Sequence, residues 1–427
     1  MNISDIHASC SFAGRRVRSR TVRIYACHKK STMSEHRDKN AVTPFKREEY
    51  ITPPRVLWRR GLSEGVVNPP AVVDRYVLLE LGDHLYAFNA VDGALADEAD
   101  FHVRMQNDNL FYASFSGLDP RDVRGMFMGP QESAALTTNH VYRLCDGRKV
   151  LQQGGGTAGV PLMIGKRIYY TFVDGAGETS VVAHDLEEQY TVWEQRLIGF
   201  QAILKFPPAT DGELLFVRSY SYLHALNIQD GSLIWSTKLT GKEKEEGYRD
   251  IVYFSAPVCY KGTVYLFRDE YLIPYHQKTG ETNYNSWRRY LGSIGLSAME
   301  AGPTPILKGD RIYTAGALYF ISGHLAALGG GDTADGDSFS RVCSFDLDLK
   351  RTVWEVDVGD TSISHIALGG KYLLAVDYNG KVLCFSTETG AILWGGTLDG
   401  GVRVRPVFYF GRVYVATDAG WLYCLAL

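Results

Sequence analysis

The 427-residue sequence has no apolar run approaching the roughly 18 residues that a membrane-spanning helix needs. Its formal net charge of −3 gives no overall basic footprint of the kind that nucleic-acid-binding domains show. The seven cysteines form no CxxC motif, no adjacent pair and no spacing typical of a zinc site. An odd number of cysteines without a secretory signal fits a reducing compartment. The sequence therefore predicts a soluble, cytoplasmic protein that neither spans a membrane nor binds nucleic acid.

The first 40 residues differ in composition from the rest of the chain. Seven basic residues lie between Arg15 and Lys30, and Asp5 is the only acidic residue before Glu35. The segment has no apolar core, which excludes a secretory signal. Three interpretations stay open: an over-long gene start with Met33 as the initiator instead of Met1, an organellar transit peptide, and a flexible basic arm. We expect residues 1–45 to be an extension and residues 50–427 to form one folded domain.

Forty-four glycines and 26 tyrosines favour many short strands joined by tight turns. The strongest signal is a self-similarity with a period of about 45 residues. In four copies, two short strands flank an Asp-Gly or Thr-Gly hairpin turn, at Gly93, Gly231, Gly280 and Gly390. A small or compact residue stands six positions before each of these glycines, namely Ala87, Ala225, Pro274 and Cys384. Ala183, Ser344 and Cys424 take the same place in other copies, so we expect Cys384 and Cys424 to be packing residues.

A second half-repeat precedes the first. An aromatic residue follows eight positions after each of five prolines, with a glycine turn between them; the prolines are Pro161, Pro208, Pro257, Pro305 and Pro406. Proline is tolerated as the first residue of a strand, where no ladder hydrogen bond is lost. The complete unit is then one four-stranded antiparallel blade. Such a blade cannot bury both faces alone and must stack on its neighbours.

The copies lie near residues 69–101, 130–153, 158–199, 207–241, 256–292, 302–359 and 363–400, with a partial copy at 402–427. The partial copy lacks its outer strand, and Arg55–Leu62, which contains Trp58, has the character of the missing strand. Pairing the two ends in one blade would remove free sheet edges. The sequence therefore predicts an all-β, eight-bladed β-propeller of four-stranded antiparallel blades, closed by an N-terminal strand that completes the last blade.

These units resemble the PQQ-like (quinoprotein-type) β-propeller repeat, with its docking pattern A-x-(D/N)-x-x-(T/D)-G-x-x-x-W. The stretch from Ala225 to Trp235 fits closely, and the stretch from Cys384 to Trp394 fits with one substitution. The resemblance covers about residues 55–427 and implies that the repeat residues stabilise blade-on-blade packing. These residues are Trp58, Trp193, Trp235, Trp354, Trp394, Gly93, Gly231, Gly280 and Gly390. The family includes quinone-dependent alcohol dehydrogenases and a non-enzymatic outer-membrane assembly factor, which is more similar in size, so family alone does not decide function.

An enzyme of the quinoprotein type would need a cofactor pocket, commonly roofed by adjacent cysteines, together with calcium ligands and an aspartate base. The sequence has no Cys-Cys pair, and no acidic constellation stands out in it. His184 and His224 lie singly in strands and are expected to be packing residues. We therefore predict no cofactor, no metal site and no catalytic residue.

Three insertions interrupt the blade period, and loops that a rigid scaffold holds out are where function concentrates. Phe101–Met128 is rich in aromatic residues and methionine, which suits a protein-binding surface, packing over a blade edge, or a place in the second blade. Its candidate binding residues are Phe111, Tyr112, Phe115 and Phe127. Lys242–Asp250 is interpreted as a solvated loop. Ala317–Ser340, with its Gly/Asp-rich centre, is interpreted as a flexible linker because its spacing is not that of a calcium loop.

Three arginines complete the set of candidate binding residues. Arg143 occupies the normally small position of the second blade, and Arg403 and Arg405 flank the first strand of the closing blade. Lining the central channel, they would bind an anion or an acidic peptide; internal salt bridges are the alternative.

These observations favour a non-catalytic, monomeric propeller that acts as a scaffold for protein–protein interaction, with a protein partner of unknown identity. Two alternatives stay open: a PQQ- and metal-dependent oxidoreductase, and a binder of a small ligand or carbohydrate in the axial channel. A transit peptide at the N-terminus would place the protein in an organelle instead of the cytoplasm.

Overall fold

The computed structural model describes residues 42–44, 52–63, 65–66, 68–81, 84–97, 111–114, 139–146, 148–153, 157–173, 179–197, 207–219, 222–239, 255–268, 271–282, 288–289, 304–319, 338–359, 361 and 363–427. The chain divides into Met1–Asn40 and Ala41–Leu427, and every described residue belongs to the second unit. All regular elements in these ranges are β-strands. Within them, no helix has the length and apolar character to cross a membrane.

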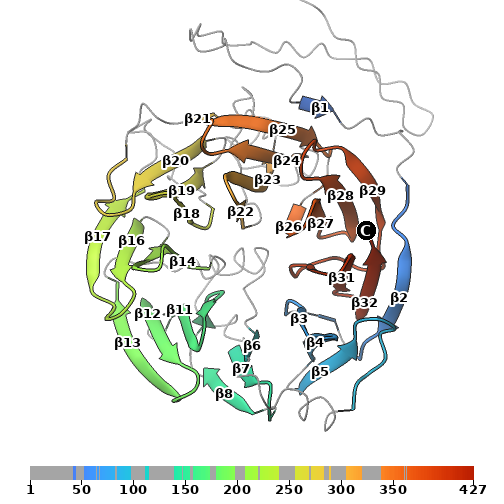
Figure 1. The fold of residues 1–427 in the computed structure, drawn as a ribbon, viewed down its shortest axis with the longest axis horizontal. Helices are drawn as coiled ribbons and strands as arrows, with labels where there is room; N and C mark the ends of the chain where they lie inside the picture. The colour runs from blue at the N-terminus through green and yellow to red at the C-terminus, as the bar shows by residue number, and fades with distance from the viewer. Residues whose placement is uncertain are drawn as a thin grey trace, which may run out of the picture. The chain divides into compact units, whose positions relative to one another are not determined.

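The described strands form eight sheets, which follow one another along the chain and are numbered here in that order (Figure 1). Sheet 1 holds β3 (Ala71–Val73), β4 (Tyr76–Leu81) and β5 (His84–Asn89), and sheet 2 holds β6 (Phe111–Ser114), β7 (Asn139–Arg143) and β8 (Lys149–Gln153). Sheet 3 holds β9 (Thr157–Ala158), β10 (Leu162–Ile164), β11 (Arg167–Val173), β12 (Thr179–Asp185) and β13 (Tyr190–Arg196). Sheet 4 holds β14 (Ala209–Thr210), β15 (Leu214–Arg218), β16 (Tyr222–Asn227) and β17 (Leu233–Lys238).

The remaining four sheets come from the second half of the chain. Sheet 5 holds β18 (Val258–Tyr260), β19 (Thr263–Arg268), β20 (Tyr271–His276) and β21 (Arg288–Arg289). Sheet 6 holds β22 (Ile306–Lys308), β23 (Arg311–Tyr319), β24 (Ser338–Asp346), β25 (Arg351–Asp357) and β1 (Val42–Pro44). Sheet 7 holds β26 (Ile363–Gly369), β27 (Tyr372–Asp377), β28 (Lys381–Ser386) and β29 (Ile392–Thr397). Sheet 8 holds β30 (Val407–Tyr409), β31 (Arg412–Thr417), β32 (Trp421–Ala426) and β2 (Val56–Gly61).

The sheets differ in detail from a uniform set of four-stranded blades. Four have four strands, sheets 3 and 6 have five, and sheets 1 and 2 have three within the described residues. The fifth strand of sheet 6, β1, runs parallel to β25, whereas all other strand pairs are antiparallel. The second sheet begins earlier than expected, because β6 lies inside the predicted insertion at 101–128. The predicted insertion at 317–340 is also shorter, because β23 and β24 extend into it.

The proline-to-aromatic spacing sets the register of the innermost hairpin of five sheets. Each proline stands immediately before a strand, where its missing N–H costs no ladder hydrogen bond. The residue after the proline pairs with the aromatic residue across the turn: Leu162 with Tyr169, Ala209 with Phe216, Val258 with Tyr265, Ile306 with Tyr313, and Val407 with Tyr414. The sequence spacing thus corresponds to a direct cross-strand pair.

The small residues of the repeat lie opposite its tryptophans. The pairs are Ala183 with Trp193, Ala225 with Trp235, Ser344 with Trp354, Cys384 with Trp394, and Cys424 with Trp58. A small side chain on the third strand leaves room for the indole on the fourth. Cys384 and Cys424 are fully buried at this position, as packing residues would be.

Each docked tryptophan lies against the turn of the next sheet. Trp193 Nε1 donates a hydrogen bond of 3.2 Å to Ile228 O in sheet 4. Its ring covers Gly231, whose φ is +74° and where an added Cβ would lie 2.5 Å from the indole Cε3. Equivalent contacts join Trp58 to Gly93, Trp235 to Gly280, and Trp354 to Gly390. Glycine is required here because the turn needs a positive φ and the indole occupies the space of a side chain.

An arginine and a tyrosine reinforce two of these contacts. Ala90 O, in the turn of sheet 1, accepts hydrogen bonds from Trp58 Nε1 (3.3 Å), Arg412 Nη1 (2.8 Å) and Tyr414 Oη (2.9 Å). Thr387 O in sheet 7 accepts from Trp354 (2.9 Å), and Arg311 and Tyr313 lie 3.5 Å away. One carbonyl therefore gathers three donors from the preceding sheet.

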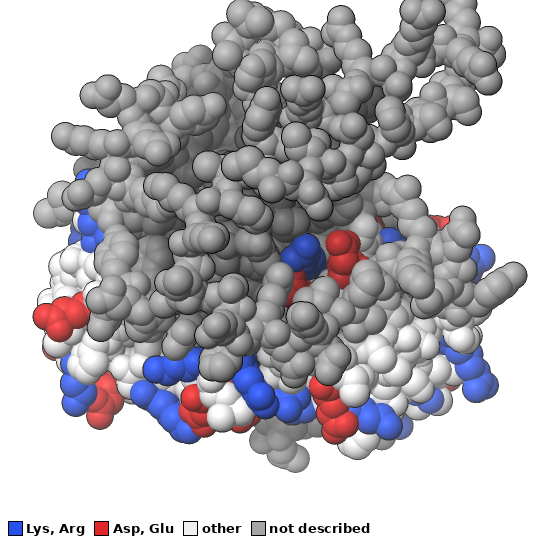
Figure 2. Space-filling model, turned by 90° about the horizontal axis from the view of Figure 1, so that it is seen from above, with Lys and Arg blue, Asp and Glu red and all other residues white. Residues whose placement is uncertain are grey.

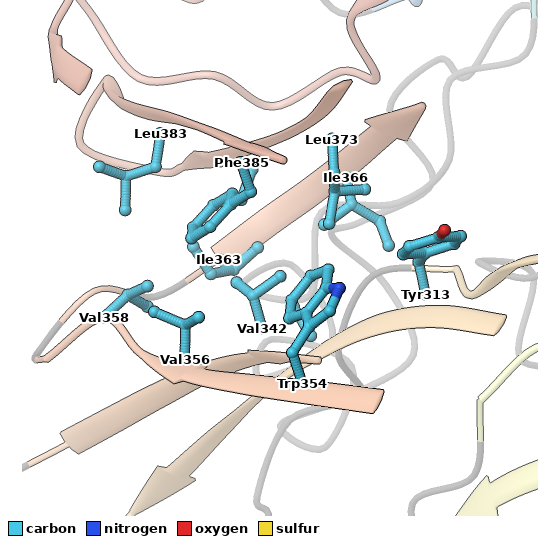
Figure 3. Packing of buried hydrophobic residues seen from close by; sticks show 12 residues of the cluster. Tyr313, Val342, Trp354, Val356, Val358, Ile363, Ile366, Leu373, Leu383 and Phe385 are labelled. Atoms are coloured by element: carbon cyan, nitrogen blue, oxygen red, sulfur yellow. The ribbon is translucent and has the colours of Figure 1, made fainter. Parts of the chain in front are cut away.

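The core is divided among the faces between consecutive sheets. Eight clusters of buried hydrophobic residues each take their members from two sheets. Figure 3 shows the cluster between sheets 6 and 7, in which the rings of Trp354 and Phe385 stack at a centroid distance of 6.4 Å. Another cluster joins sheet 8 to sheet 1 through Tyr414, Leu79 and Phe88.

The N-terminal strand β2 occupies the place at the outer edge of sheet 8 where the sequence predicted it (Figure 1). It pairs antiparallel with β32, with Trp58 opposite Cys424 and Gly61 opposite Trp421. The fourth strand of the last sheet therefore comes from the other end of the chain.

Candidate functional site

The two ends of the sheets carry different kinds of connection. Because neighbouring strands are antiparallel, the first-to-second and third-to-fourth connections of a sheet lie at one end, which we call the turn end. Short turns such as those at Gly165 and Gly231 lie there. The second-to-third connections and the links between sheets start and finish at the opposite end, which we call the connection end. Residues 115–138, 240–254 and 320–337 join strands that end there.

The aromatic candidates of the first insertion fall into two groups. Phe111 and Tyr112 belong to β6, where their backbones pair with those of Arg143 and Tyr142. They are therefore part of the second sheet, one of the places that the sequence left open. Phe115 and Phe127 lie outside the described residues, as does the charged stretch 242–250.

Arg143 forms a local ion pair at the turn end of sheet 2. Its guanidinium donates to both carboxylate oxygens of Asp146, with Nε 3.1 Å from each. The hydrogen bond from Arg143 holds the pKa of Asp146 below its usual value, and the same bond raises the pKa of Arg143. Of the two predicted roles, the internal salt bridge is the one present.

The two arginines near β30 differ from one another. Arg403 Nε donates to Asp418 Oδ2 at 2.7 Å, and Asp418 Oδ1 accepts from the Gly401 N–H at 2.7 Å. Arg405 is exposed and has neither a hydrogen bond nor an ion pair with the described part of the chain. Desolvation by the surrounding protein lowers the pKa of Arg405 from its usual value. The sequence assigned the same candidate role to Arg403 and Arg405. In the structure Asp418 neutralises the charge of Arg403, whereas Arg405 has no ion pair with the described residues.

The sequence analysis missed buried charged side chains near the connection end, among them Glu80 and Arg218. Glu80 is 3% exposed and accepts hydrogen bonds from Tyr142 Oη (2.5 Å) and Asn68 Nδ2 (3.0 Å), which links sheet 1 to sheet 2. Arg218 is 4% exposed and donates to Ser255 O at 3.4 Å, which links sheet 4 to sheet 5. Each stands two residues after the second-strand residue that pairs across the first hairpin of its sheet: Leu78 for Glu80 and Phe216 for Arg218. Other sheets have Thr171, Phe267, Ala315, Val376 and Ala416 there, so a charged residue among uncharged equivalents was the available signal.

The buried thiols and imidazoles are not poised for chemistry at neutral pH. Burial raises the pKa of the Cys384 thiol to about 12 and also raises the pKa of Cys343 and Cys424, so these thiols stay protonated. Burial lowers the pKa of His224 to about 4, and its Nδ1 lies 2.5 Å from Ser236 Oγ. Within the described ranges, no group of three His, Cys, Asp or Glu side chains is placed to hold a metal ion.

Charges of both signs lie side by side on the described surface seen in Figure 2. At the turn end, Lys261 Nζ lies 2.7 Å from Asp348 and Lys166 Nζ lies 2.9 Å from Glu187. Both pairs are largely exposed, so each stabilises the fold only slightly.

Consecutive antiparallel sheets that dock tryptophan on glycine define a β-propeller protein. The family model described as outer membrane protein assembly factor BamB matches residues 177–337 and 338–426, more than half of the chain. The chain belongs to this family of PQQ-like repeat propellers.

Solved structures are similar to this chain at low sequence identity. The computationally designed Ika8 protein is 11% identical with a TM-score of 0.58, covering 88% of this chain and 100% of its own. Quinohemoprotein alcohol dehydrogenase from Comamonas testosteroni is 11% identical with a TM-score of 0.57, covering 87% and 76%. BamB from Moraxella catarrhalis is 13% identical with a TM-score of 0.43, covering 88% and 100%. No curated protein sequence matches the chain.

Proposed function

We propose that residues 50–427 form a closed eight-bladed propeller that acts as a non-catalytic scaffold and binds a protein partner through its connection end. Closure is supported by the eight hydrophobic clusters, each shared by two sheets, including the cluster between sheets 8 and 1. The pairing of β2 with β32 supports the same arrangement.

The observation that carries the binding role is the difference between the two ends of the sheets. The turn end is built from short turns held by tryptophan, glycine and arginine contacts with the preceding sheet. The connection end receives the strands that long insertions join, and the buried charges of Glu80 and Arg218 lie near it. Variable segments on a rigid frame are typical of binding surfaces. The family's description as an assembly factor supports a protein partner.

The scaffold proposal is tested by purifying the tagged full chain from its native host and mapping cross-links to the bound protein. We expect a stoichiometric partner, cross-linked to residues at the connection end. Replacing residues 115–138 by a short Gly/Ser linker should reduce recovery of the partner about tenfold or more. The double variant Lys278→Ala/Glu388→Ala, at exposed turn-end positions, should recover it normally. A chain that purifies without any partner, or cross-links confined to the turn end, would contradict the proposal.

A direct assay addresses the oxidoreductase alternative. The full chain is incubated with PQQ and Ca²⁺, and dye reduction is followed with alcohols and sugars as substrates. We expect a rate equal to that of the cofactor alone. Clear turnover above this background would overturn the non-catalytic part of the proposal.

A further inference from the structure

The segment that leads into β30 carries two arginines, Arg403 and Arg405. Val402, Val404 and Pro406 are buried, whereas Arg403 is partly buried and Arg405 is exposed. The strand β30 lies at the edge of sheet 8 opposite β2, and β2 is the outer strand in Figure 1. Arg405 therefore stands just before the inner-edge strand, at the connection end of the sheet.

Arg405 differs from Arg403 in its electrostatic surroundings. The charge of Arg403 is neutralised by Asp418 at 2.7 Å, whereas none of the described carboxylates pairs with Arg405. The side chain of Arg405 is open to solvent, yet the surrounding protein desolvates its guanidinium and lowers its pKa. An arginine nevertheless stays charged at any physiological pH. The result is a fixed positive charge that is exposed to solvent next to the inner-edge strand of sheet 8 and has no ion-pair partner among the described residues.

The chemistry of this group points to one kind of ligand. A guanidinium offers a planar fork of donors that matches the two oxygens of a carboxylate. A single unpaired arginine compensates one negative charge, whereas phosphate recognition typically uses a cluster of cations. We propose that Arg405 binds a carboxylate carried by an acidic segment of a protein partner. This inference rests on the proposed scaffold function and names the chemistry of one of its contacts.

The test uses the full-length chain and a fluorescein-labelled hexaglutamate peptide, with binding followed by fluorescence anisotropy. Arg405→Gln should weaken binding about tenfold or more, because the charge and the fork are both lost. Arg405→Lys keeps the charge but not the fork, so its affinity should lie between those of the wild-type chain and Arg405→Gln. Arg59→Gln is the matched control: it makes the same change in net charge, at an exposed residue on the outer strand β2 that pairs with Asp399. It should stay within about twofold of the wild-type affinity.

Thermal unfolding of Arg405→Gln should match that of the wild-type chain, since Arg405 contributes no hydrogen bond to the described fold. Competition by acetate would indicate a site for the carboxylate alone, and resistance to acetate would indicate that the peptide chain also contributes; both support the proposal. Equal weakening by Arg405→Gln and Arg59→Gln, or no binding of hexaglutamate to the wild-type chain, would overturn it. If one of these two overturning results is obtained and a stoichiometric partner is still recovered from the host, the carboxylate site is wrong but the scaffold function stands.

Discussion

At the residue scale, the indole of Trp193 in sheet 3 packs against sheet 4 in the space that a side chain at Gly231 would occupy. The indole ring takes the space that a Cβ at Gly231 would occupy, and its Nε1 bonds to the same turn. Burial of the ring, the hydrogen bond and the positive φ therefore all depend on glycine. A substitution there disturbs packing and backbone conformation at once.

Gly231→Ala should destabilise the protein by about 2–4 kcal/mol more than Gly165→Ala. Gly165 also has a positive φ, of +58°, but nothing lies within 4 Å of an added Cβ, so its alanine variant reports only the backbone strain of roughly 1 kcal/mol. The free energy of unfolding from urea titration gives both values. Equal losses for the two variants would show that the indole contact contributes nothing.

Trp354 and Trp394 provide a second matched pair, because both indoles are buried and pair with a small residue. Trp354 Nε1 donates to Thr387 O at 2.9 Å, whereas Trp394 Nε1 has no hydrogen-bond partner in the described part of the chain. Trp354→Phe should therefore cost about 1–2 kcal/mol more than Trp394→Phe. Urea denaturation of the two variants checks the difference, which disappears if the hydrogen bond is energetically neutral.

The buried imidazole of His224 predicts a pH-dependent loss of stability. Burial lowers its pKa from 6.5 to about 4, so between these values the unfolded chain binds a proton that the folded chain does not. Above about pH 6.5 His224 is neutral in both states and the free energy of unfolding keeps its full value. As the pH falls toward 4, the free energy of unfolding decreases by about 3 kcal/mol. His224→Gln should flatten the stability profile in this window. Replacement of the exposed His84 by Gln should leave the profile unchanged, and a matching change in both variants would exclude His224 as the source.

At the element scale, sequence periodicity predicts strands that repeat and misses those that do not. The pairing of Leu162 with Tyr169 and of Ala225 with Trp235 follows from spacing alone, because the spacing reflects a fixed number of residues in a hairpin. The strand β6 has no repeat spacing that could have predicted it. The parallel pairing of β1 with β25 depends on a neighbour more than 300 residues away in sequence. The burial of Glu80 depends on Tyr142 of the adjacent sheet, and the lack of an ion pair at Arg405 among the described residues depends on where the carboxylates of the fold lie, so residue type alone could not reveal either.

Removing Arg55–Leu62 should prevent stable folding, because it takes away β2, the tryptophan that covers Gly93 and the outer neighbour of β32. Removing residues 1–40 should change the unfolding midpoint by no more than a few degrees. Circular dichroism and thermal unfolding of the two deletion variants provide the comparison. A cooperative unfolding transition in the 55–62 deletion at the wild-type temperature would contradict the role assigned to β2.

At the scale of the whole molecule, the proposed closure makes the two ends of the folded domain neighbours. Gly61 and Trp421 are paired across β2 and β32 although 360 positions separate them in sequence. Sheet 8, which holds this pair, buries one face against sheet 1 and the other against sheet 7, through two hydrophobic clusters. The stability of any one sheet is therefore expected to depend on its neighbours on both sides.

The double variant Gly61→Cys/Trp421→Cys should form an intramolecular disulfide under oxidising conditions, since cross-strand partners lie within the range that a disulfide spans. The bond should stabilise the protein by about 2–5 kcal/mol relative to its reduced form, because it joins distant parts of the unfolded chain. Peptide mapping identifies the bond, and urea denaturation with and without reductant measures its effect. Intermolecular dimers in place of the internal bond would argue against closure.

The pairing of β2 with β32 also bears on how the protein is made. A ribosome adds roughly 5–20 residues per second, so the partner strand of β2 emerges on the order of 20–70 seconds after β2 itself. Through that interval the nascent chain carries an unmatched β-strand whose backbone donors and acceptors are open to other chains. Translation that stops before residue 421 leaves β2 without its partner, and such a fragment exposes this strand to chaperones and proteases.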